Sequence, residues 1–381
     1  MNFFQTIFNY IRETYTDRLF YFPSNIRISL LIILFCVIAV LELYLYISFR
    51  RAQQIKKKRD EAKWKEYIDN MLANLVIFDE SDSTEEIVDH FYPKMSKLPL
   101  RNAIVNEVLT VEIITYHKNF TGKIQEVLSI LYRRLNLDKQ SKKKINNKNW
   151  EVKIEGIREA NEMRITEMAG EIIKYTDDEN GLLRMEAQAA YIKLSEQYPF
   201  RFLDRAQERI LDWHQVVLFE IITKNKQLAI PSFSHWLRSS NDTVVMLCLK
   251  LIDHFMQFDA AEEVERLLKH HNPKVVKKSV EIIGKLELAD AEKHMFEVYF
   301  DQPEEIKLEI LNSLGKISSG NYNEFLSSRI YSSDPKIKKE ALYAIKRNPA
   351  YGEAKLREIY KQTTLENQAL IKHVLDHRIK Q

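Results

Sequence analysis

The sequence predicts an all-α protein, an α-solenoid of helical hairpins preceded by one transmembrane helix. Three observations favour this fold. The C-terminal two thirds repeat with a period of about 31 residues, one segment near the N-terminus is almost wholly apolar, and the 381 residues include only 8 Gly and 9 Pro. Because glycine and proline interrupt helices, so few of them in a chain of this length indicate long helical stretches with short connections.

Residues 1–27 are expected to form an amphipathic segment in the membrane interface. Phe4, Ile7, Phe8 and Ile11 would share one face of a helix, and Pro23 would end it. An unstructured tail is the alternative.

Residues 28–49 are predicted to be a transmembrane helix. The segment Ile28 to Phe49 holds a single charge, Glu42. As a helix it would reach roughly 33 Å at ~1.5 Å per residue, which is enough to cross the hydrocarbon core of a bilayer. A cleaved signal peptide is disfavoured, because the preceding segment is long and no small-residue cleavage motif follows.

Residues 50–70 are expected to continue as a basic juxtamembrane helix. Basic side chains crowd its start, which suits both the topology signal and anionic lipid head groups: Arg50, Arg51, Lys56, Lys57, Lys58 and Arg59. The positive-inside rule then places the C-terminal body in the cytoplasm and the N-terminus outside. Two cysteines without a disulfide pattern fit that reducing compartment, and a bacterial inner membrane is the expected location.

Glu42 is unusual because a carboxylate within a membrane span is costly. It lies about two turns before Arg50. One interpretation is a polar contact with another membrane protein, and the other is an acidic residue tolerated near the end of the span.

The repeat is visible at one recurring apolar position, for which we take Val275 as the marker. The equivalent residues follow at steps of 31, 30, 31, 31, 31 and 31, namely Val152, Leu183, Trp213, Val244, Val275, Ile306 and Ile337. Small residues such as Gly156 and Ser279 tend to follow four positions later, and larger apolar residues eight positions later. Spacings of four and eight fall on one helical face, so each marker indicates an amphipathic helix.

A second amphipathic helix is expected before each marker. Apolar residues recur seven and eleven positions upstream, as Leu268 and Val264 do before Val275. The turn between the two helices carries Asn, Asp or Pro, which favour a helix start. One hairpin cannot bury its apolar face alone, whereas stacked copies can, so the period predicts a solenoid.

The hairpins resemble HEAT repeats. The stretches "NPKVVKKSVEIIGKL", "DPKIKKEALYAIK" and "NGLLRMEAQAAYIKL" are similar to the Asp-Pro, Val-Arg and small-residue pattern of that family in its compact bacterial form. The resemblance covers roughly residues 120–380 and implies a right-handed α-solenoid. It specifies function hardly at all, because one fold carries many functions.

Two further regions complete the predicted organisation. Residues 71–120 are expected to form irregular helical pairs, and residues 121–381 the repeat solenoid with a polar capping copy at its end. A basic insertion within the repeats, which includes Lys142, Lys143 and Lys144, is expected to be a solvated loop.

The sequence carries no signature of catalysis, of a cofactor or of a metal. Glycine-rich phosphate loops and the G-x-S-x-G, C-x-x-C and H-E-x-x-H motifs do not occur in it. His270 and His271, with His254 and His294 near them in the chain, lack the usual ligand spacing. A polar turn is therefore the preferred interpretation of the histidine pair.

The second helices of the middle repeats carry apolar residues beyond the face that the markers define. These are Val216, Leu218, Val245, Met246 and Leu247. Second helices line the concave wall of HEAT-like solenoids, so the resemblance implies an apolar groove for a protein partner. The alternative is that both sides of these helices pack inside the solenoid.

These features together predict a membrane-anchored cytoplasmic scaffold or adaptor, not an enzyme. The expected partner is another inner-membrane or membrane-associated protein, for example an envelope glycosyltransferase, although no residue selects that example. Two alternatives stay open: an enzyme on a HEAT-like scaffold that acts on nucleic-acid bases or bilins, and a membrane signal regulator that uses Glu42. Residues 66–381 carry a net charge of −3, which argues against nucleic acid as a partner.

Overall fold

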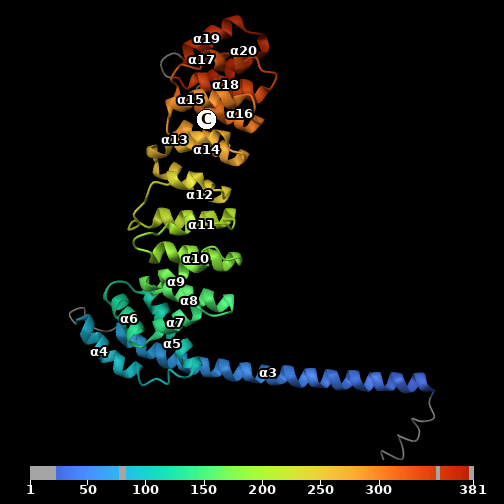
Figure 1. The fold of residues 1–381 in the computed structure, drawn as a ribbon, viewed down its shortest axis with the longest axis vertical. Helices are drawn as coiled ribbons and strands as arrows, with labels where there is room; N and C mark the ends of the chain where they lie inside the picture. Colours follow the sequence, from blue (N-terminus) through green and yellow to red (C-terminus); the bar gives the residue numbers. More distant parts are fainter. Residues whose placement is uncertain (1–22, 77–82, 349–351, 377–381) are drawn as a thin grey trace, which may run out of the picture. The chain divides into compact units, whose positions relative to one another are not determined.

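The structure is a computed structural model that describes residues 23–76, 83–348 and 352–376. These residues form helices and turns with no β-strand among them, so the all-α prediction is confirmed (Figure 1). Most of the predicted amphipathic segment, residues 1–22, lies outside the described residues. The chain divides into two compact units, unit 1 up to Leu137 and unit 2 from Asp138.

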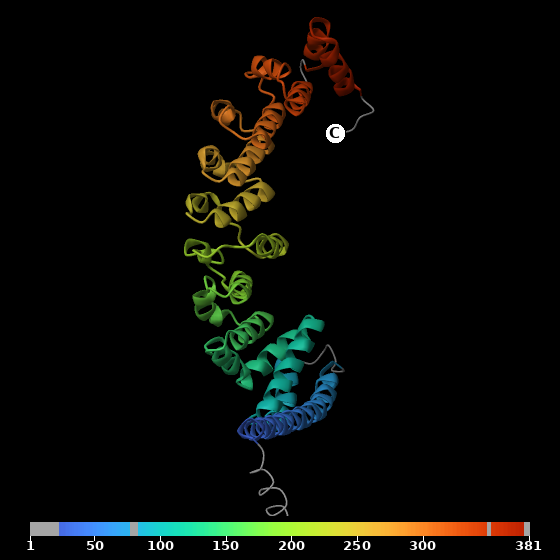
Figure 2. The same cartoon turned by 90° about the vertical axis from the view of Figure 1, so that its right-hand side faces the viewer.

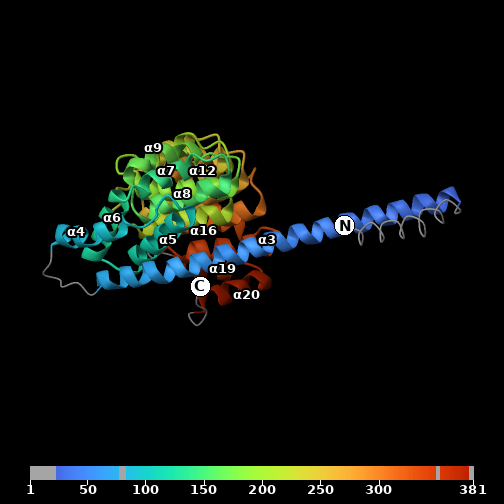
Figure 3. The ribbon, with the colours of Figure 1, turned by 90° about the horizontal axis from the view of Figure 1, so that it is seen from below.

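Unit 1 is organised around one long helix, α3 (Ser24–Val76), which runs without interruption through the predicted span and the basic segment (Figure 3). By length and composition α3 is able to cross a membrane. Every side chain between Ile28 and Arg59 is exposed. Near the end of α3, by contrast, residues spaced by four and three are buried where the helix packs on α5 (Ala103–Asn119): Ile68, Leu72 and Leu75.

Two shorter helices complete unit 1, α4 (Thr84–Met95) and α6 (Lys123–Arg134), which pack against each other. A capping box starts α4, because the backbone N–H of Glu86 donates to Ser83 Oγ at 3.2 Å and the N–H of Ser83 donates to Glu86 Oε2 at 2.9 Å. The repeat pattern predicts that α6 is part of the solenoid. In the structure, α6 belongs to the same compact unit as α3.

The basic insertion predicted as a loop is a helix, α7 (Leu137–Ile145), so that prediction is wrong. Leu137, Ser141 and Ile145 are spaced by four and are fully buried, which gives this segment an inward face despite its lysines. Lys144 is also held in place, since its Nζ lies 2.5 Å from Oε1 of the buried Glu159.

Unit 2 alternates first elements, most of them short, with second helices. The second helices are α8 (Trp150–Glu162), α10 (Gly181–Leu194), α11 (Asp212–Lys224), α12 (Asp242–Phe255), α14 (Pro273–Lys285), α16 (Glu304–Ile317), α18 (Pro335–Lys346) and α20 (Leu365–Leu375). Each of them contacts the next along the chain. In Figure 2, the second helices from yellow to orange follow one side of unit 2 and the first elements follow the other.

The first elements are less regular than the sequence predicts. They are α9 (Ala169–Ile172), η4 (Arg201–Asp204), η5 (Ser234–Arg238), α13 (Ala261–Arg266), α15 (Glu292–Tyr299), α17 (Asn323–Arg329) and α19 (Gly352–Gln362). Two of them are single 3₁₀ turns, and a proline shortly precedes each, Pro199 before η4 and Pro231 before η5. Proline restricts the residue before it to extended backbone, so neither element extends further towards the N-terminus.

Asparagine or aspartate caps most second helices. The side-chain oxygen accepts the backbone N–H two residues later at Asn149, Asn180, Asn241, Asn272 and Asp334. This bond satisfies one of the donors that a helix start leaves free. The caps confirm the predicted helix starts and give a direct measure of the repeat register.

The predicted register is wrong by one residue in α11. Measured from the caps, the buried marker of α11 is His214, which is 2% exposed, whereas the predicted marker Trp213 is 52% exposed. Helix α11 begins after Leu211, which provides no side-chain cap. The sequence therefore lacked the local signal that would have located this helix start.

Glycines allow the last second helices to approach one another closely. A Cβ atom on Gly315 of α16 would lie 2.5 Å from Cα of Ala344 in α18, and one on Gly284 of α14 would lie 2.7 Å from Cα of Ser313 in α16. Both distances are far below van der Waals contact. The neighbouring helices therefore pack at a separation that only glycine permits at these two positions.

We predict that Gly315→Ala destabilises unit 2, because the added methyl group would force α16 and α18 apart. Overpacking of this kind costs about 1–3 kcal/mol, and the thermal unfolding midpoint followed by circular dichroism should fall by several degrees. Gly170→Ala is the matched control, since a Cβ atom on Gly170 meets nothing within 4 Å. A Gly315→Ala protein that melts at or above the wild-type temperature would contradict the close packing.

Candidate interaction surface on helices α10, α11 and α12

The structure divides the predicted partner-binding residues into two groups. Leu218, Val245 and Leu247 are fully buried, so the alternative that they pack inside the row of helices holds for these three. Leu218 takes an inner position because the register of α11 is shifted by one residue. Val216 is 61% exposed and Met246 is half-buried, so only these two are accessible to a partner.

Val216 and Met246 belong to a larger group of accessible apolar residues. Positions two and five after the cap lie on one side of a helix. Both positions are apolar in α10 and α11, and in α12 the fifth is Met246 while the second is Thr243. We call this group the apolar face, and it consists of Leu182, Met185, Trp213, Val216 and Met246. Leu182 is 40% exposed, and helices α10, α11 and α12 contact one another in that order.

The apolar face ends sharply on both sides. In α14 the two equivalent positions hold Lys274 and Lys277, and in α8 they hold Glu151 and the buried Ile154. Soluble proteins seldom expose contiguous apolar patches unless these bind something. The sequence pattern did not identify Trp213 as a surface residue, because it assigned Trp213 to the core. Leu182 could have been found, since it is an apolar residue directly before the marker Leu183.

Hydrogen bonds hold the helices beneath the apolar face in place. Lys250 Nζ of α12 donates to Gln215 Oε1 of α11 at 2.9 Å, and Gln215 Nε2 donates to the carbonyl oxygen of Ile210 at 3.0 Å. The buried guanidinium of Arg184 in α10 donates to the carbonyl oxygens of Asp178 and Arg209. These bonds link the three helices, so the apolar face is presented on a preorganised surface.

His214 is buried next to this network and is neutral. Its pKa is lowered from the usual 6.5 to about 4, mainly by burial and to a smaller extent by the nearby charge of Arg184. A charged imidazole would lack water in this position, which explains the shift.

An open hollow borders the apolar face at Met246. It has a volume of about 510 Å³ and lies at the N-terminal ends of α11, α12 and α14. Its lining is polar and includes Arg209, Asp212, Gln215 and Lys274. The apolar face therefore has a mixed polar rim, as the periphery of a protein interface usually does.

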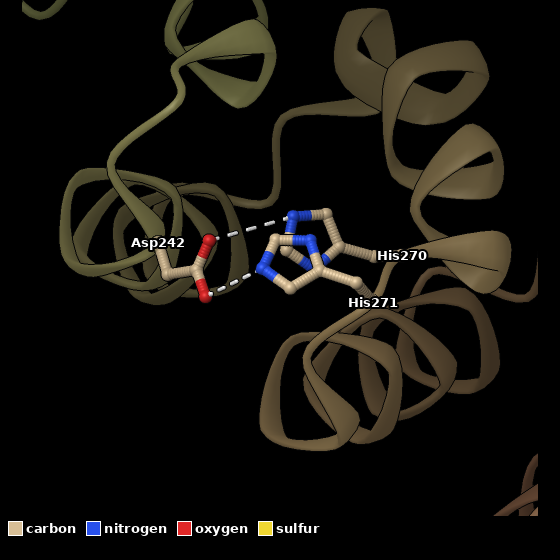
Figure 4. A group of neighbouring side chains, drawn as sticks. All are labelled: Asp242, His270 and His271. Atoms are coloured by element: carbon tan, nitrogen blue, oxygen red, sulfur yellow. Dashed lines mark ion pairs between the residues drawn. The ribbon is translucent and has the colours of Figure 1, made fainter.

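The histidine pair lies near this hollow and contacts the start of α12 (Figure 4). Asp242 Oδ2 lies 3.2 Å from His271 Nε2, and Asp242 Oδ1 lies 3.7 Å from His270 Nε2. Asn272 Nδ2 also donates to Asp242 Oδ2 at 2.7 Å. The side chains of Asp242, His270 and His271 could in principle surround a metal ion, because their ligand atoms lie within 4.8 Å of one another.

The hydrogen bonds of His270 favour a structural link over a metal site. The backbone N–H of Asn272 donates to His270 Nδ1 at 3.1 Å, so the neutral ring carries its proton on Nε2. Nε2 is the nitrogen that faces Asp242, and a protonated nitrogen cannot bind a metal. His254 lies edge-to-face against Phe255, and His294 pairs with Glu265, so neither joins this cluster.

The basic residues predicted after the span lie on the exposed part of α3. Five of these side chains are exposed, namely Arg50, Arg51, Lys56, Lys58 and Arg59. Lys57 lies 3.4 Å from Glu61 and 4.0 Å from Glu107. Glu42 is exposed within the apolar stretch.

Comparison with known proteins gives little beyond this geometry. No protein-family model and no curated protein matches the chain. Among solved structures, the crystal structure of one engineered protein shares 14% identity, with 80% of this chain and 98% of that chain covered and a TM-score of 0.35. A second engineered protein shares 14% identity, with 63% and 95% covered and a TM-score of 0.24.

We predict that acid destabilises unit 2 partly through His214. An unfolded chain binds a proton on this histidine below about pH 6.5, whereas the folded protein binds it only near pH 4. Stability should therefore fall as the pH drops from 6.5 to 4. In His214→Gln, urea unfolding midpoints should fall less over this interval, while the exposed His235→Gln control should follow the wild type. An unchanged pH dependence in His214→Gln would contradict the buried neutral histidine.

Proposed function

We propose that this chain is a single-pass membrane-anchored adaptor, whose cytoplasmic helical repeats bind a partner protein. The apolar face of α10, α11 and α12 is the observation that carries the proposal. The body would be a right-handed, HEAT-like α-solenoid, a proposal supported by the spacing of 30 or 31 residues between the starts of successive second helices and by the contacts between these helices. Such repeats usually act by offering an extended binding surface.

The apolar, unburied part of α3 supports the membrane anchor. In water, such a length of exposed apolar surface would be strongly unfavourable, whereas a bilayer would cover it. The basic residues from Arg50 to Arg59 follow this stretch directly. They favour a cytoplasmic C-terminal body in a bacterial inner membrane, and they suit anionic lipid head groups.

The proposed occupant of the apolar face is an amphipathic helix of a membrane-associated protein. Neighbouring packed helices lie about 8–10 Å apart, so a face spread over three helices extends for roughly 20 Å. A helix rises ~1.5 Å per residue, so about 13 residues of a partner would span it. Trp213 would be the main anchor, because buried tryptophans dominate many interfaces.

The membrane topology can be tested with single introduced cysteines. We expect a membrane-impermeant maleimide to label Asn25→Cys in intact cells, and to label Gln53→Cys only after permeabilisation. The native thiols should not interfere, because Cys36 would lie in the bilayer and Cys248 is buried, which raises its pKa. The opposite labelling pattern would reverse the orientation, and release of the protein by alkaline carbonate would exclude an anchor.

The interaction can be tested with a photo-crosslinking amino acid at Met185, Val216 or Met246. We expect all three positions to capture one and the same membrane-associated protein. Trp213→Ser should weaken binding of that purified partner by at least tenfold, whereas Tyr198→Ser, which removes another exposed aromatic ring, should not. Capture of a second copy of this chain, or equal capture from position 198, would contradict the proposal.

A further inference from the structure

A cluster of aromatic rings lies on the side of the first elements, in α15, α17 and the turns beside them. The ring centroid of Phe296 lies 5.0 Å from that of Phe325 and 5.4 Å from that of Tyr322. Phe300 lies 6.0 Å from Phe296 and completes the group. We call Phe296, Phe300, Tyr322 and Phe325 the aromatic cluster. The repeat pattern does not predict this cluster, because its members lie off the marker positions.

The aromatic cluster is only partly used for packing. Tyr299 beside it is buried, but Phe300 is 55% exposed. Tyr331, one period after Phe300, is 60% exposed. Two large rings, Phe300 and Tyr331, are therefore accessible at equivalent positions of neighbouring copies. Their exposed surfaces do not contribute to the hydrophobic core.

The aromatic cluster already accommodates one cation. The guanidinium carbon of Arg329 lies 5.3 Å from the ring centre of Phe325 and 5.7 Å from that of Phe300. Aromatic faces attract cations through the negative charge density above the ring. This internal contact shows that the rings are placed to receive a guanidinium group.

The exposed charges around the aromatic cluster are mainly acidic, and the half-buried Arg329 adds one positive charge beside its rings. Glu297, Asp301 and Glu324 are exposed and lie next to its rings in the chain, while Lys293 is the exposed basic side chain of α15. Burial raises the pKa of Tyr322, and the charges of Glu292 and Glu297 act in the same direction. An acidic rim around exposed rings attracts basic partners and repels phosphate groups.

We propose that the aromatic cluster and its acidic rim form a second docking surface, for an arginine- or lysine-bearing apolar segment of another protein. Its cations would stack on Phe300 and Tyr331 and pair with Asp301, Glu297 and Glu324. Because the cluster belongs to the first elements and the apolar face to the second helices, the two surfaces lie on different sides of unit 2 (Figure 2). This inference does not depend on the proposed function, since it uses other residues.

The probe for this surface is a fluorescein-labelled peptide of 14 residues, built only from arginine and leucine in an amphipathic order. A second peptide carries glutamate in place of each arginine. Binding to the full-length protein in neutral detergent is measured by fluorescence anisotropy at two salt concentrations. We expect the arginine peptide to bind, to weaken as salt rises, and the glutamate peptide not to bind.

Variants then locate the bound peptide. The combined charge reversal Glu297→Lys, Asp301→Lys and Glu324→Lys should weaken binding at least tenfold, and Tyr331→Ser should weaken it severalfold. Phe258→Ser, which removes a comparably exposed ring just before α13, should leave binding unchanged. Because the reversed charges and Tyr331 are all exposed, these variants should fold, which circular dichroism would verify.

Three results would overturn the inference. The first is that the charge-reversed protein binds the arginine peptide as tightly as the wild type does. The second is that Phe258→Ser loses as much affinity as Tyr331→Ser. The third is that Trp213→Ser abolishes peptide binding while the charge reversal does not, which would assign the peptide to the apolar face. Loss of partner crosslinking at Val216 alone would contradict the proposed function and leave this second surface intact.

Discussion

The architecture of unit 2 depends on asparagine side chains that serve two copies of the repeat at once. Asn241 Oδ1 accepts the N–H of Thr243 at the start of α12, while its Nδ2 donates to the carbonyl oxygens of Ala206 and Glu208 in the preceding turn. Asn272 caps α14 in the same way and also donates to Asp242. A lost cap costs about 0.5–2 kcal/mol. Replacement of Asn241 or Asn272 would also remove the hydrogen bonds that these side chains donate to the preceding copy of the repeat.

This constraint decides which side chains reach the surface. In α10, α11 and α12 the third residue after the cap position is buried, while the second and fifth are at least partly exposed. Helix α11 follows the same rule without a side-chain cap, and its outward positions hold Trp213 and Val216. The exposed Leu211 at its cap position adds a third apolar residue. Packing within the row does not require these residues, which supports a role in binding.

The sequence was sufficient for the helices of unit 2 but not for all of its surface. Most caps and most markers were visible as Asn or Asp followed three residues later by an apolar residue, as with Asn272 and Val275. The pattern failed where Leu211 replaced the cap, and this single displacement assigned Trp213 to the core and Leu218 to the surface. The aromatic cluster was missed for another reason. Phe296 and Phe325 are far apart in the chain, and only the contact between α15 and α17 brings them together.

The two proposed surfaces should respond independently to mutation. In a row of repeats each copy contacts mainly its neighbours, so energetic coupling fades within a few copies. Helix α14 lies in sequence between the apolar face, which ends in α12, and the aromatic cluster, which begins in α15. Residues without shared contacts usually contribute additively. A protein with two such surfaces could therefore hold two different partners without linking their affinities, as an adaptor requires.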